Sequence, residues 1–313
     1  MKNNVEIAIV GGGLAGLCAA LTLQHPDRRV HLIESSDLPQ QKSTGLNSRS
    51  IALSGSSAQI FRSLGLWSEI RKQAAPIRTI HISSQGRWGV TRLHASDYEL
   101  DALGYVIESS ILGKLLLDRV NNSQLITLDS GAQFENAEYG ETVHLDYLYR
   151  NKKKQLNANL VLVADGASSK ARASLGIEHR VIDYGQAAVI TNLQVSKPVA
   201  GAAYERFTTE GPLAMLPLGR NRYACVWTHN PDNTDHLMQL GDEQFAEVLQ
   251  QSFGYRLGFI EQVGQRSSFS LHRTEALTLA KNRCVLIGSA ASALHQVAGQ
   301  SFNLALRDLA SLY

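Results

Sequence analysis

The feature that most constrains the fold is a glycine-rich turn near the N-terminus. Residues 5–10, VEIAIV, form an apolar run typical of a buried strand, and the segment LAGLCAALTLQ after the glycines predicts a helix. In the spacing Gly11-x-Gly13-x-x-Gly16, the first glycine permits a tight turn, the second lets the backbone approach a pyrophosphate, and the third lets the helix pack closely on the strand. The helix N-terminus adds free N–H groups. This segment predicts a dinucleotide site, with a purely structural turn as the alternative.

An acidic residue ends the next predicted strand. The segment RRVHLIE closes on Glu34, which lies 18 residues after Gly16. A carboxylate at that place accepts hydrogen bonds from ribose hydroxyls and repels a 2′-phosphate. The pattern therefore favours NAD or FAD over NADP.

Two more loops follow predicted strands. LVLVADGASSKAR, residues 160–172, carries Asp165 beside Gly166, and residues 285–313 read as strand, small-residue loop and helix. A strand-end aspartate next to glycine can bind ribose or ribityl hydroxyls while the backbone passes close to the ligand. Three such loops exceed what a simple NAD domain needs, which favours FAD.

Composition excludes several classes of protein. The 313 residues carry a net charge of only +2, so no broad basic face for nucleic acid is expected. Three widely spaced cysteines in apolar runs indicate buried thiols in a cytoplasmic protein, and the ten histidines form no metal-like cluster. Residues 7–23 carry no charge, but these 17 residues with four glycines are short for a membrane span, which needs about 20.

The order of predicted elements indicates an α/β fold. A Rossmann-like FAD-binding domain is expected from discontinuous segments, together with a β-sheet-rich substrate domain. Helices are predicted over residues 55–74 and 109–120 and near 242–252. The predicted FAD-binding parts are 1–75, 101–178 and 279–313, and the predicted substrate-domain parts are 76–100 and 179–278.

Four further segments carry a resemblance to a known family. They are SRSIALSGSSAQIFRSLGLW (48–67), YERFTTEGPLAMLPL (204–218), FGYRLG (253–258) and HQVAGQSFNLALRD (295–308). Together with the three strand-end loops they resemble the flavoprotein aromatic hydroxylases of the p-hydroxybenzoate hydroxylase type, and within them the ubiquinone-biosynthesis branch. The resemblance runs from about residue 5 to residue 313.

This resemblance implies an enzyme activity. The expected reaction is hydroxylation of a polyprenylated methoxyphenol through a C4a-hydroperoxyflavin, with bound FAD, O2 and NAD(P)H as a transient reductant. The absence of a second dinucleotide fingerprint fits this family. The substrate also implies contact with other ubiquinone-biosynthesis proteins and peripheral contact with the inner membrane surface.

The resemblance also implies site residues. Those expected to hold FAD are Gly11, Gly13, Leu14, Ala15, Gly16, Glu34, Arg49, Asp165, Gly288, Ser289, Gly299, Gln300 and Asn303. His295 and Gln300 are expected to face the flavin, but no catalytic side chain and no metal ligand is assigned. An apolar channel for the tail is expected from five residues, with ordinary core packing as the alternative: Phe207, Leu213, Met215, Leu216 and Trp227.

The chain departs from the family pattern at several positions. Ser289 stands where an aspartate is usual, Ser301 and Ala305 replace glycines, Gln296 replaces a proline, and Asn47 replaces an acid. The family also continues for several tens of residues beyond the last residue here, so the third FAD-binding part is expected to be cut short. These features leave open a catalytically impaired or flavin-free subunit of a ubiquinone-synthesis assembly, and a prenyl reductase is a third alternative.

Overall fold

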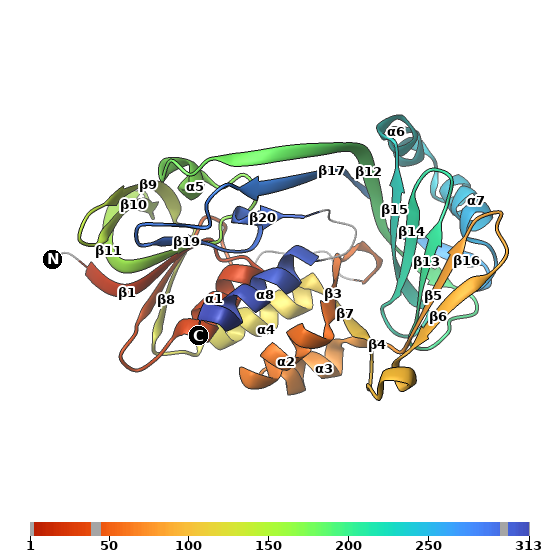
Figure 1. The fold of residues 1–313 in the computed structure, drawn as a ribbon, viewed down its shortest axis with the longest axis horizontal. Coiled ribbons are helices and arrows are strands. Elements are labelled where there is room, and N and C mark those ends of the chain that lie inside the picture. Colours follow the sequence, from red (N-terminus) through yellow and green to blue (C-terminus); the bar gives the residue numbers. More distant parts are fainter. Residues whose placement is uncertain (1–2, 39–44, 295–299, 313) are drawn as a thin grey trace.

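The computed structural model describes residues 3–38, 45–294 and 300–312. Two large sheets lie side by side and are connected by the long strands β12 (His179–Val195) and β17 (Ser267–Ala276), as Figure 1 shows. Helices pack between and outside the sheets. This is the mixed α/β architecture that the sequence predicts, and that fold prediction is confirmed.

The first sheet has eight strands within the described residues, with the order β18-β19-β11-β1-β2-β8 and with β10 and β9 continuing from β11. Its central strands β11, β1, β2 and β8 pair in parallel, as expected for near-continuous apolar runs buried on both faces. The bounds are β1 (Asn3–Val10), β2 (Val30–Glu34), β8 (Ile126–Ser130), β9 (Gln133–Tyr139), β10 (Val143–Tyr149), β11 (Lys152–Val163), β18 (Ala280–Lys281) and β19 (Cys284–Leu286).

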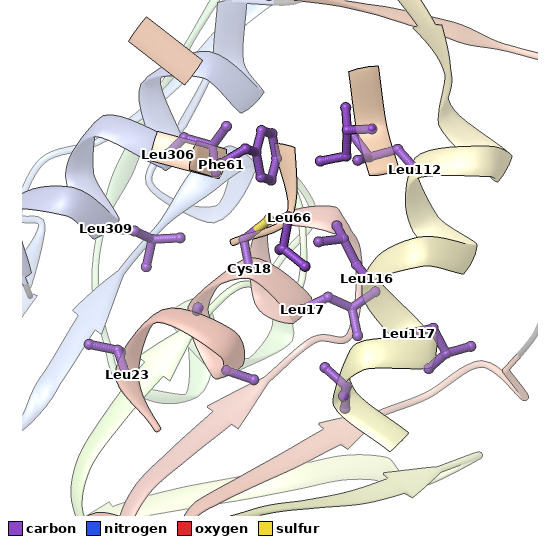
Figure 2. Close-up of a cluster of buried hydrophobic side chains, with 14 of the residues drawn as sticks. Leu17, Cys18, Leu23, Phe61, Leu66, Leu112, Leu116, Leu117, Leu306 and Leu309 are labelled. Carbon is purple, nitrogen blue, oxygen red and sulfur yellow. The ribbon is translucent and has the colours of Figure 1, made fainter. Parts of the chain in front are cut away.

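Helices cover one face of this sheet. They are α1 (Leu14–Leu23), α2 (Gly55–Ser63), α3 (Trp67–Gln73), α4 (Ser109–Asn121) and α8 (Gln300–Leu312). Because side chains alternate along a strand, Ile7 and Ile9 of β1 point into the helical layer, whereas Ala8 points to the opposite face. Figure 2 shows this layer, in which leucines from α1, α4 and α8 meet around Cys18.

The predicted helix over 55–74 is two helices. The chain breaks between α2 and α3 at Gly65, whose φ of +68° lies in the left-handed region that ends helices. The apolar residues keep their helical spacing across this break. The sequence pattern therefore did not indicate that one helix ends and another begins. The opposite face of the sheet is covered by the β9–β10 hairpin and by α5 (Lys170–Ser174).

The second sheet has nine strands among the described residues, in the order β20-β17-β12-β15-β14-β13-β5-β6, with β16 beside β12. Besides β12 and β17, its strands are β5 (Thr79–Ser84), β6 (Val90–His94), β13 (Ala202–Phe207), β14 (Pro212–Pro217), β15 (Arg222–His229), β16 (Ile260–Val263) and β20 (Ser292–Ala293). Helices α6 (Pro231–Gln239) and α7 (Asp242–Phe253) cover its outer face (Figure 1).

Helix α6 was not predicted, although its start carries a clear signal. Asn230 caps the helix by accepting a hydrogen bond from the Asn233 backbone N–H, and Pro231 occupies the first turn. Helix α7 agrees closely with the helix predicted near 242–252. All three cysteines are buried and free, which confirms the sequence interpretation.

A small sheet lies between the two large ones. It is formed by β3 (Ser50–Ser54), β7 (Gly104–Glu108) and β4 (Ala75–Ile77) in the order β3-β7-β4. The strands of the first large sheet come from three separate segments, 3–34, 126–163 and 280–286. Residues 292–293, shortly after the last of these segments, form β20 of the second sheet. The domain boundaries themselves stay a prediction. Within the described part of the chain, no helix is long and apolar enough to cross a bilayer.

Candidate functional site

The glycine loop lies at the carboxyl end of β1 and is packed too tightly for a side chain at Gly11, Gly12 and Gly16. Gly11 has a φ of +106°, and a Cβ placed on it would lie 2.5 Å from the Ala164 carbonyl carbon. A Cβ on Gly16 would lie 1.8 Å from the Gly11 carbonyl oxygen. The roles predicted for Gly11 in the turn and for Gly16 in helix packing therefore have a direct steric basis in the structure.

Gly13 has a different environment. No heavy atom of the described residues lies within 4 Å of a Cβ placed there, and Gly13 forms the N-terminal boundary of α1. Open space in front of the first turn of a helix is what a phosphate group requires. Leu14 packs against the helical core and also lines, with Gly12 and Gly13, a cavity of about 400 Å³.

The carboxylate of Glu34 points back to the glycine loop. It is buried at the end of β2, where it accepts hydrogen bonds from the backbone N–H groups of Gly12 and Ser36. A Cβ on Gly12 would lie 2.7 Å from the Glu34 Cβ, so this contact also requires a glycine. Gly12 was not predicted as a site residue, although its place between Gly11 and Gly13 was visible. The assignment of Glu34 to a ribose stays a prediction.

Asp165 supplies the second motif. The carbonyl of Val10 accepts a hydrogen bond from the Ala164 N–H at 2.7 Å, which sets Asp165 next to the glycine loop. One carboxylate oxygen accepts a hydrogen bond from the Ala171 N–H at 3.1 Å. The other, Oδ1, is buried without a hydrogen-bond partner in residues 3–38, 45–294 and 300–312.

Asp165 also lines a cavity of about 350 Å³ at the carboxyl edge of the parallel strands. The cavity wall includes Gly11, Ser35, Ser168 and Lys170. A buried carboxylate oxygen without a partner is costly unless a ligand or water satisfies it. This edge is where open α/β sheets bind their ligands, so the residues present fit a hydroxylated, phosphorylated cofactor.

The third motif meets the first two at Gly288. This residue follows β19 with a φ of +59°, and a Cβ on it would lie 3.0 Å from the Ala15 Cβ and 3.7 Å from the Ala305 Cβ. Ala15 and Ala305 thus occupy space between α1, α8 and the third loop. Ser289 follows Gly288 and is half-buried.

Arg172 ties the second motif to the third. Its buried guanidinium donates to the Ala290 carbonyl at 2.9 Å and to the Ala167 carbonyl at 2.8 Å. No role was predicted for Arg172, the last residue of the segment 160–172. An arginine shortly after a strand-end aspartate was the only available signal.

Helix α8 is held against β3 and α2 by Asn303. Its amide nitrogen donates to the Ala52 carbonyl, and its amide oxygen accepts from the Ser54 N–H and the Ser57 hydroxyl, at 2.6–2.9 Å. A contact between Asn303 and the flavin stays a prediction, because the structure shows this side chain engaged with its own chain.

The start of α8 has its own side-chain contact. The Ser301 hydroxyl accepts a hydrogen bond from the Leu294 N–H at 2.9 Å, so the serine that replaces a family glycine joins the two ends of the loop. Gln300 is the first residue of α8 and is exposed. His295, Gln296 and Gly299 lie outside the described residues.

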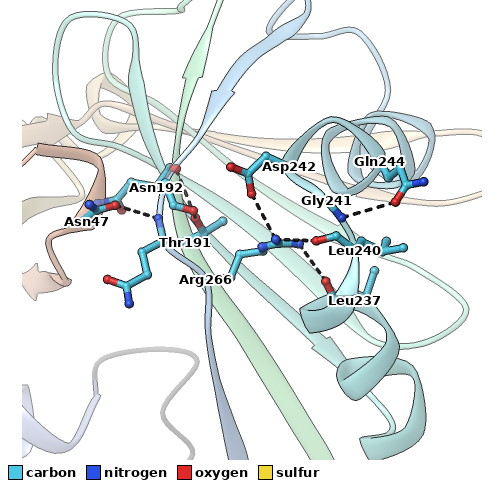
Figure 3. A network of polar contacts seen from close by, with 11 residues as sticks. Asn47, Thr191, Asn192, Leu237, Leu240, Gly241, Asp242, Gln244 and Arg266 are labelled. Atoms are coloured by element: carbon cyan, nitrogen blue, oxygen red, sulfur yellow. Dashed lines mark hydrogen bonds and ion pairs between the residues drawn. The ribbon is translucent and has the colours of Figure 1, made fainter.

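Arg49 lies where the two large sheets approach each other. Its guanidinium stacks on the Phe269 ring of β17, 4.6 Å from the ring centroid. The segment just before it is anchored to the second sheet: Asn47 accepts from the Gln265 N–H at 2.8 Å, and Asn192 donates to the Ser48 carbonyl at 2.6 Å. Figure 3 shows Asn47, Thr191 and Asn192 in this contact region.

The predicted substrate channel is partly wrong. Leu213, Met215 and Trp227 point to the outer face of the second sheet, where they form a core with α6 and α7. Residues one step away on the same strands, such as Ala214 and Val226, point to the inner face that fronts the first sheet. The sequence reveals this alternation but not which face is turned inward.

Two predicted channel residues do lie on the inner face. Phe207 is opposite Pro212 at the end of β13 and is 50% exposed, and Leu216 packs beside Ala203 and Val106. The inner face also carries Ala188, Ile190 and Leu271, which cluster with Ala214 and Val226. This mostly apolar surface suits a hydrophobic substrate.

Comparison with known proteins agrees with this geometry. A family profile described as FAD binding domain matches residues 4–313. Ubiquinone hydroxylase UbiL of Rhodospirillum rubrum is 32% identical over 98% of this chain and 71% of its own length. The 3-demethoxyubiquinol 3-hydroxylase of Escherichia coli is 28% identical over 98% of this chain and 78% of its own.

A solved structure extends the fold similarity. The p-nitrophenol 4-monooxygenase PnpA of Pseudomonas putida superposes with a TM-score of 0.81 at 18% identity, covering 99% of this chain and 79% of that one. At this identity the similarity concerns the fold. It places the three-sheet arrangement among those known for monooxygenases.

Proposed function

The chain belongs to the FAD-binding domain family, and on that premise we propose that it hydroxylates a polyprenylated methoxyphenol in ubiquinone biosynthesis. It is an FAD-dependent monooxygenase, in line with its family and its curated relatives. NAD(P)H is the transient reductant and O2 the second substrate. Within the family, the chain resembles 2-polyprenyl-6-methoxyphenol hydroxylase. Which ring carbon is hydroxylated stays a prediction.

One observation supports the cofactor assignment above the others. Three loops that are distant in sequence, at Gly11, Asp165 and Gly288, converge at one edge of the parallel sheet. There the Asp165 Oδ1 is buried with no hydrogen-bond partner in the described ranges, beside the cavity of about 350 Å³. A dinucleotide offers the hydroxyl donor that this oxygen lacks and the phosphate that suits the open side of Gly13.

Bound FAD would supply the redox chemistry that activates O2, and the chain supplies position and environment. Backbone N–H groups at the start of α1 stabilise the pyrophosphate charge. Asp165 fixes a sugar or ribityl hydroxyl. Arg49 holds a positive charge at the junction of the sheets, and the apolar inner face of the second sheet excludes water from the ring of the substrate.

The substrate class rests on two supports. The inner face carries aliphatic residues and the exposed ring of Phe207, which suit an isoprenoid tail. By their names, the two relatives are a ubiquinone hydroxylase and a 3-demethoxyubiquinol 3-hydroxylase. Contact with a membrane surface or with other enzymes of the same route is part of this proposal.

The test begins with protein purified without added FAD. A visible flavin spectrum is expected, with NAD(P)H oxidation stimulated by a geranylated 2-methoxyphenol and a product heavier by one oxygen atom in mass spectrometry. Protein that lacks flavin and cannot be loaded with it would favour the non-catalytic subunit. Flavin-containing protein that reduces an isoprenoid double bond instead would favour a prenyl reductase.

A further inference from the structure

One carboxylate, that of Glu205, lies within the mostly apolar inner face of the second sheet. Glu205 is on β13, paired with Ala214 on β14 and with Ile82 on β5. Its neighbours in the strand show its direction: Tyr204 packs with Phe253 on the outer face, whereas Ala203 packs with Val106 on the inner side. Because β13 pairs without a register shift, Glu205 points inward like Ala203.

The inner direction leads toward the cofactor-binding part. On β12, Asn192 points the same way as Ile190, and it bonds to the Ser48 carbonyl next to Arg49. Ile190 is opposite Val226, Val226 is opposite Ala214, and Ala214 is opposite Glu205. A row of side chains therefore runs across the sheet from Ile190, two residues before Asn192 on β12, to Glu205.

Within the described part of the chain, the carboxylate of Glu205 has no partner. Among residues 3–38, 45–294 and 300–312, no hydrogen bond or ion pair involves it, and it is only partly exposed. Burial raises the pKa of Glu205 above its ordinary value, and no charged neighbour opposes that effect. An unpartnered, partly buried carboxylate is costly to keep unless it has a role.

The groups around Glu205 offer it no counter-charge. Ala214 and Ile82 flank it from the two neighbouring strands, and neither titrates. Arg206, the next residue, points to the outer face, where it donates to the Ser252 carbonyl at 2.7 Å. Along β13 the inward neighbours are Ala203 and Phe207, which are also uncharged.

We propose that Glu205 binds the phenolic hydroxyl of the substrate and acts as the base that takes its proton during hydroxylation. This assignment rests on the function proposed above. A carboxylate is the natural acceptor for a phenol O–H, and a mostly apolar wall lets the ring and tail lie against the sheet. Phe207, two residues along the strand on the same face, is placed to contact the tail.

The proton and electron balance is as follows. The phenolic O–H bond breaks, its proton passes to Glu205, and the electron pair remains on oxygen and enriches the ring. A C–O bond forms with one atom of O2, the other atom leaves as water, and NAD(P)H provides the two electrons. The attacked ring carbon then loses its hydrogen as a proton, and Glu205 returns its own proton to the phenolic oxygen.

The test compares Glu205→Gln with wild-type holoenzyme. The probe is a geranylated 2-methoxy-4-nitrophenol, which is blocked at the para carbon and whose phenolate is coloured. Because the carboxylate repels a phenolate and the amide does not, the pKa of the bound probe is expected to be about one unit lower in Glu205→Gln, a tenfold change in its ionisation. With an unblocked phenol, kcat is expected to fall about 100-fold.

The pH profile gives a second readout. In the wild type, kcat/KM is expected to rise with pH as Glu205 loses its proton, and this acid limb is expected to disappear in Glu205→Gln. Glu205→Asp keeps a carboxylate and is expected to restore part of the rate and the acid limb. Glu261→Gln, an exposed carboxylate on β16 of the same sheet, is the matched control and is expected to behave as wild type.

The outcomes separate the two proposals. Flavin content and the thermal midpoint identify any variant that fails to fold. If Glu205→Gln fails to fold, Glu205→Asp is compared with the wild type instead. A wild type that responds to phenol, together with a Glu205→Gln protein of unchanged probe pKa and kcat, overturns the assignment of Glu205 alone. A wild type that neither binds the probe nor responds to any phenol overturns the proposed function, and the assignment with it.

Discussion

In the eight-stranded sheet the candidate site consists of strand ends, whereas in the nine-stranded sheet it consists of side chains in the middle of strands. Around Gly11 and Gly16 the closest approaches are between backbone atoms, and side chains are excluded. On the second sheet, Ala214 and Glu205 contribute side chains from one face, while the outer face is filled by a core with α7. At Gly11 and Gly16 the first surface has no room for an added atom, whereas the second surface is defined by which face of the sheet points inward.

The difference teaches how each part limits change. A site formed by backbone atoms, such as the glycine loop, is a backbone-built site. An added side chain there clashes with a carbonyl, and no rotamer can relieve that clash. A site formed by the side chains of one sheet face fails in one of two ways. Either the core on the outer face is lost, or the polarity or charge of the inner face changes. The following predictions probe that contrast.

The largest effect is expected from the outer core of the second sheet. Trp227 is 2% exposed and packs against Phe245 and His229, so Trp227→Ala is expected to lower the free energy of unfolding by about 3–5 kcal/mol. Phe207→Ala, on the inner face, is expected to change it by less than about 0.5 kcal/mol but to raise KM for a tailed phenol. Urea denaturation measures the free energy of unfolding of both variants, and steady-state kinetics measure KM. Equal losses of stability would contradict the division of the sheet into a core face and a substrate face.

A smaller effect is expected at the glycine loop. Gly16→Ala must displace the Gly11 carbonyl, so a loss of about 1–3 kcal/mol and of bound flavin is expected. Gly13→Ala has open space around it, so the unfolding midpoint is expected to stay near that of the wild type while flavin affinity falls. Thermal unfolding and flavin absorbance after gel filtration separate the two variants. Normal flavin content in both would contradict a backbone-built site.

The smallest effect concerns pH. His229 is buried beside Trp227, and both ring nitrogens lack partners among the described residues; burial lowers its pKa, although Glu210 opposes the shift. The unfolded chain takes up a proton near pH 6.5 while the folded chain does not, so stability falls as pH drops below that value, by at most about 1.4 kcal/mol per unit. His229→Leu is expected to flatten this slope in urea titrations from pH 7 to about 5. Parallel slopes would show that His229 takes up its proton over the same pH range in the folded and the unfolded protein.

Local signals predicted the first sheet well. The spacing of Gly11, Gly13 and Gly16 and the ends of strands at Glu34 and Asp165 follow from residues close in sequence, and the structure has β1, α1 and β2 where they were expected. The role of each residue toward FAD stays a prediction. The FAD-binding family and the enzyme class inferred from the resemblance are confirmed.

The second sheet was harder to predict in physical terms. Alternation along β14 was visible in the sequence, but choosing Leu213 and Met215 for the channel required knowing that α7 covers their side. Glu205 was passed over because one carboxylate in a strand has no distinctive spacing. The bonds from Asn47 and Asn303 to distant segments likewise depend on tertiary packing and not on local pattern.

The contact between Asn303 and Ser54 joins residues 249 positions apart in the chain. With Gly288 against Ala15, it means that the candidate cofactor edge is closed by segments from nearly opposite ends of the sequence. During synthesis on the ribosome, the first strand and helix emerge long before the residues that complete the pocket. Flavin capture is therefore expected to come late in biogenesis, and nascent chains halted before Gly288 should retain no flavin even when their earlier strands are folded.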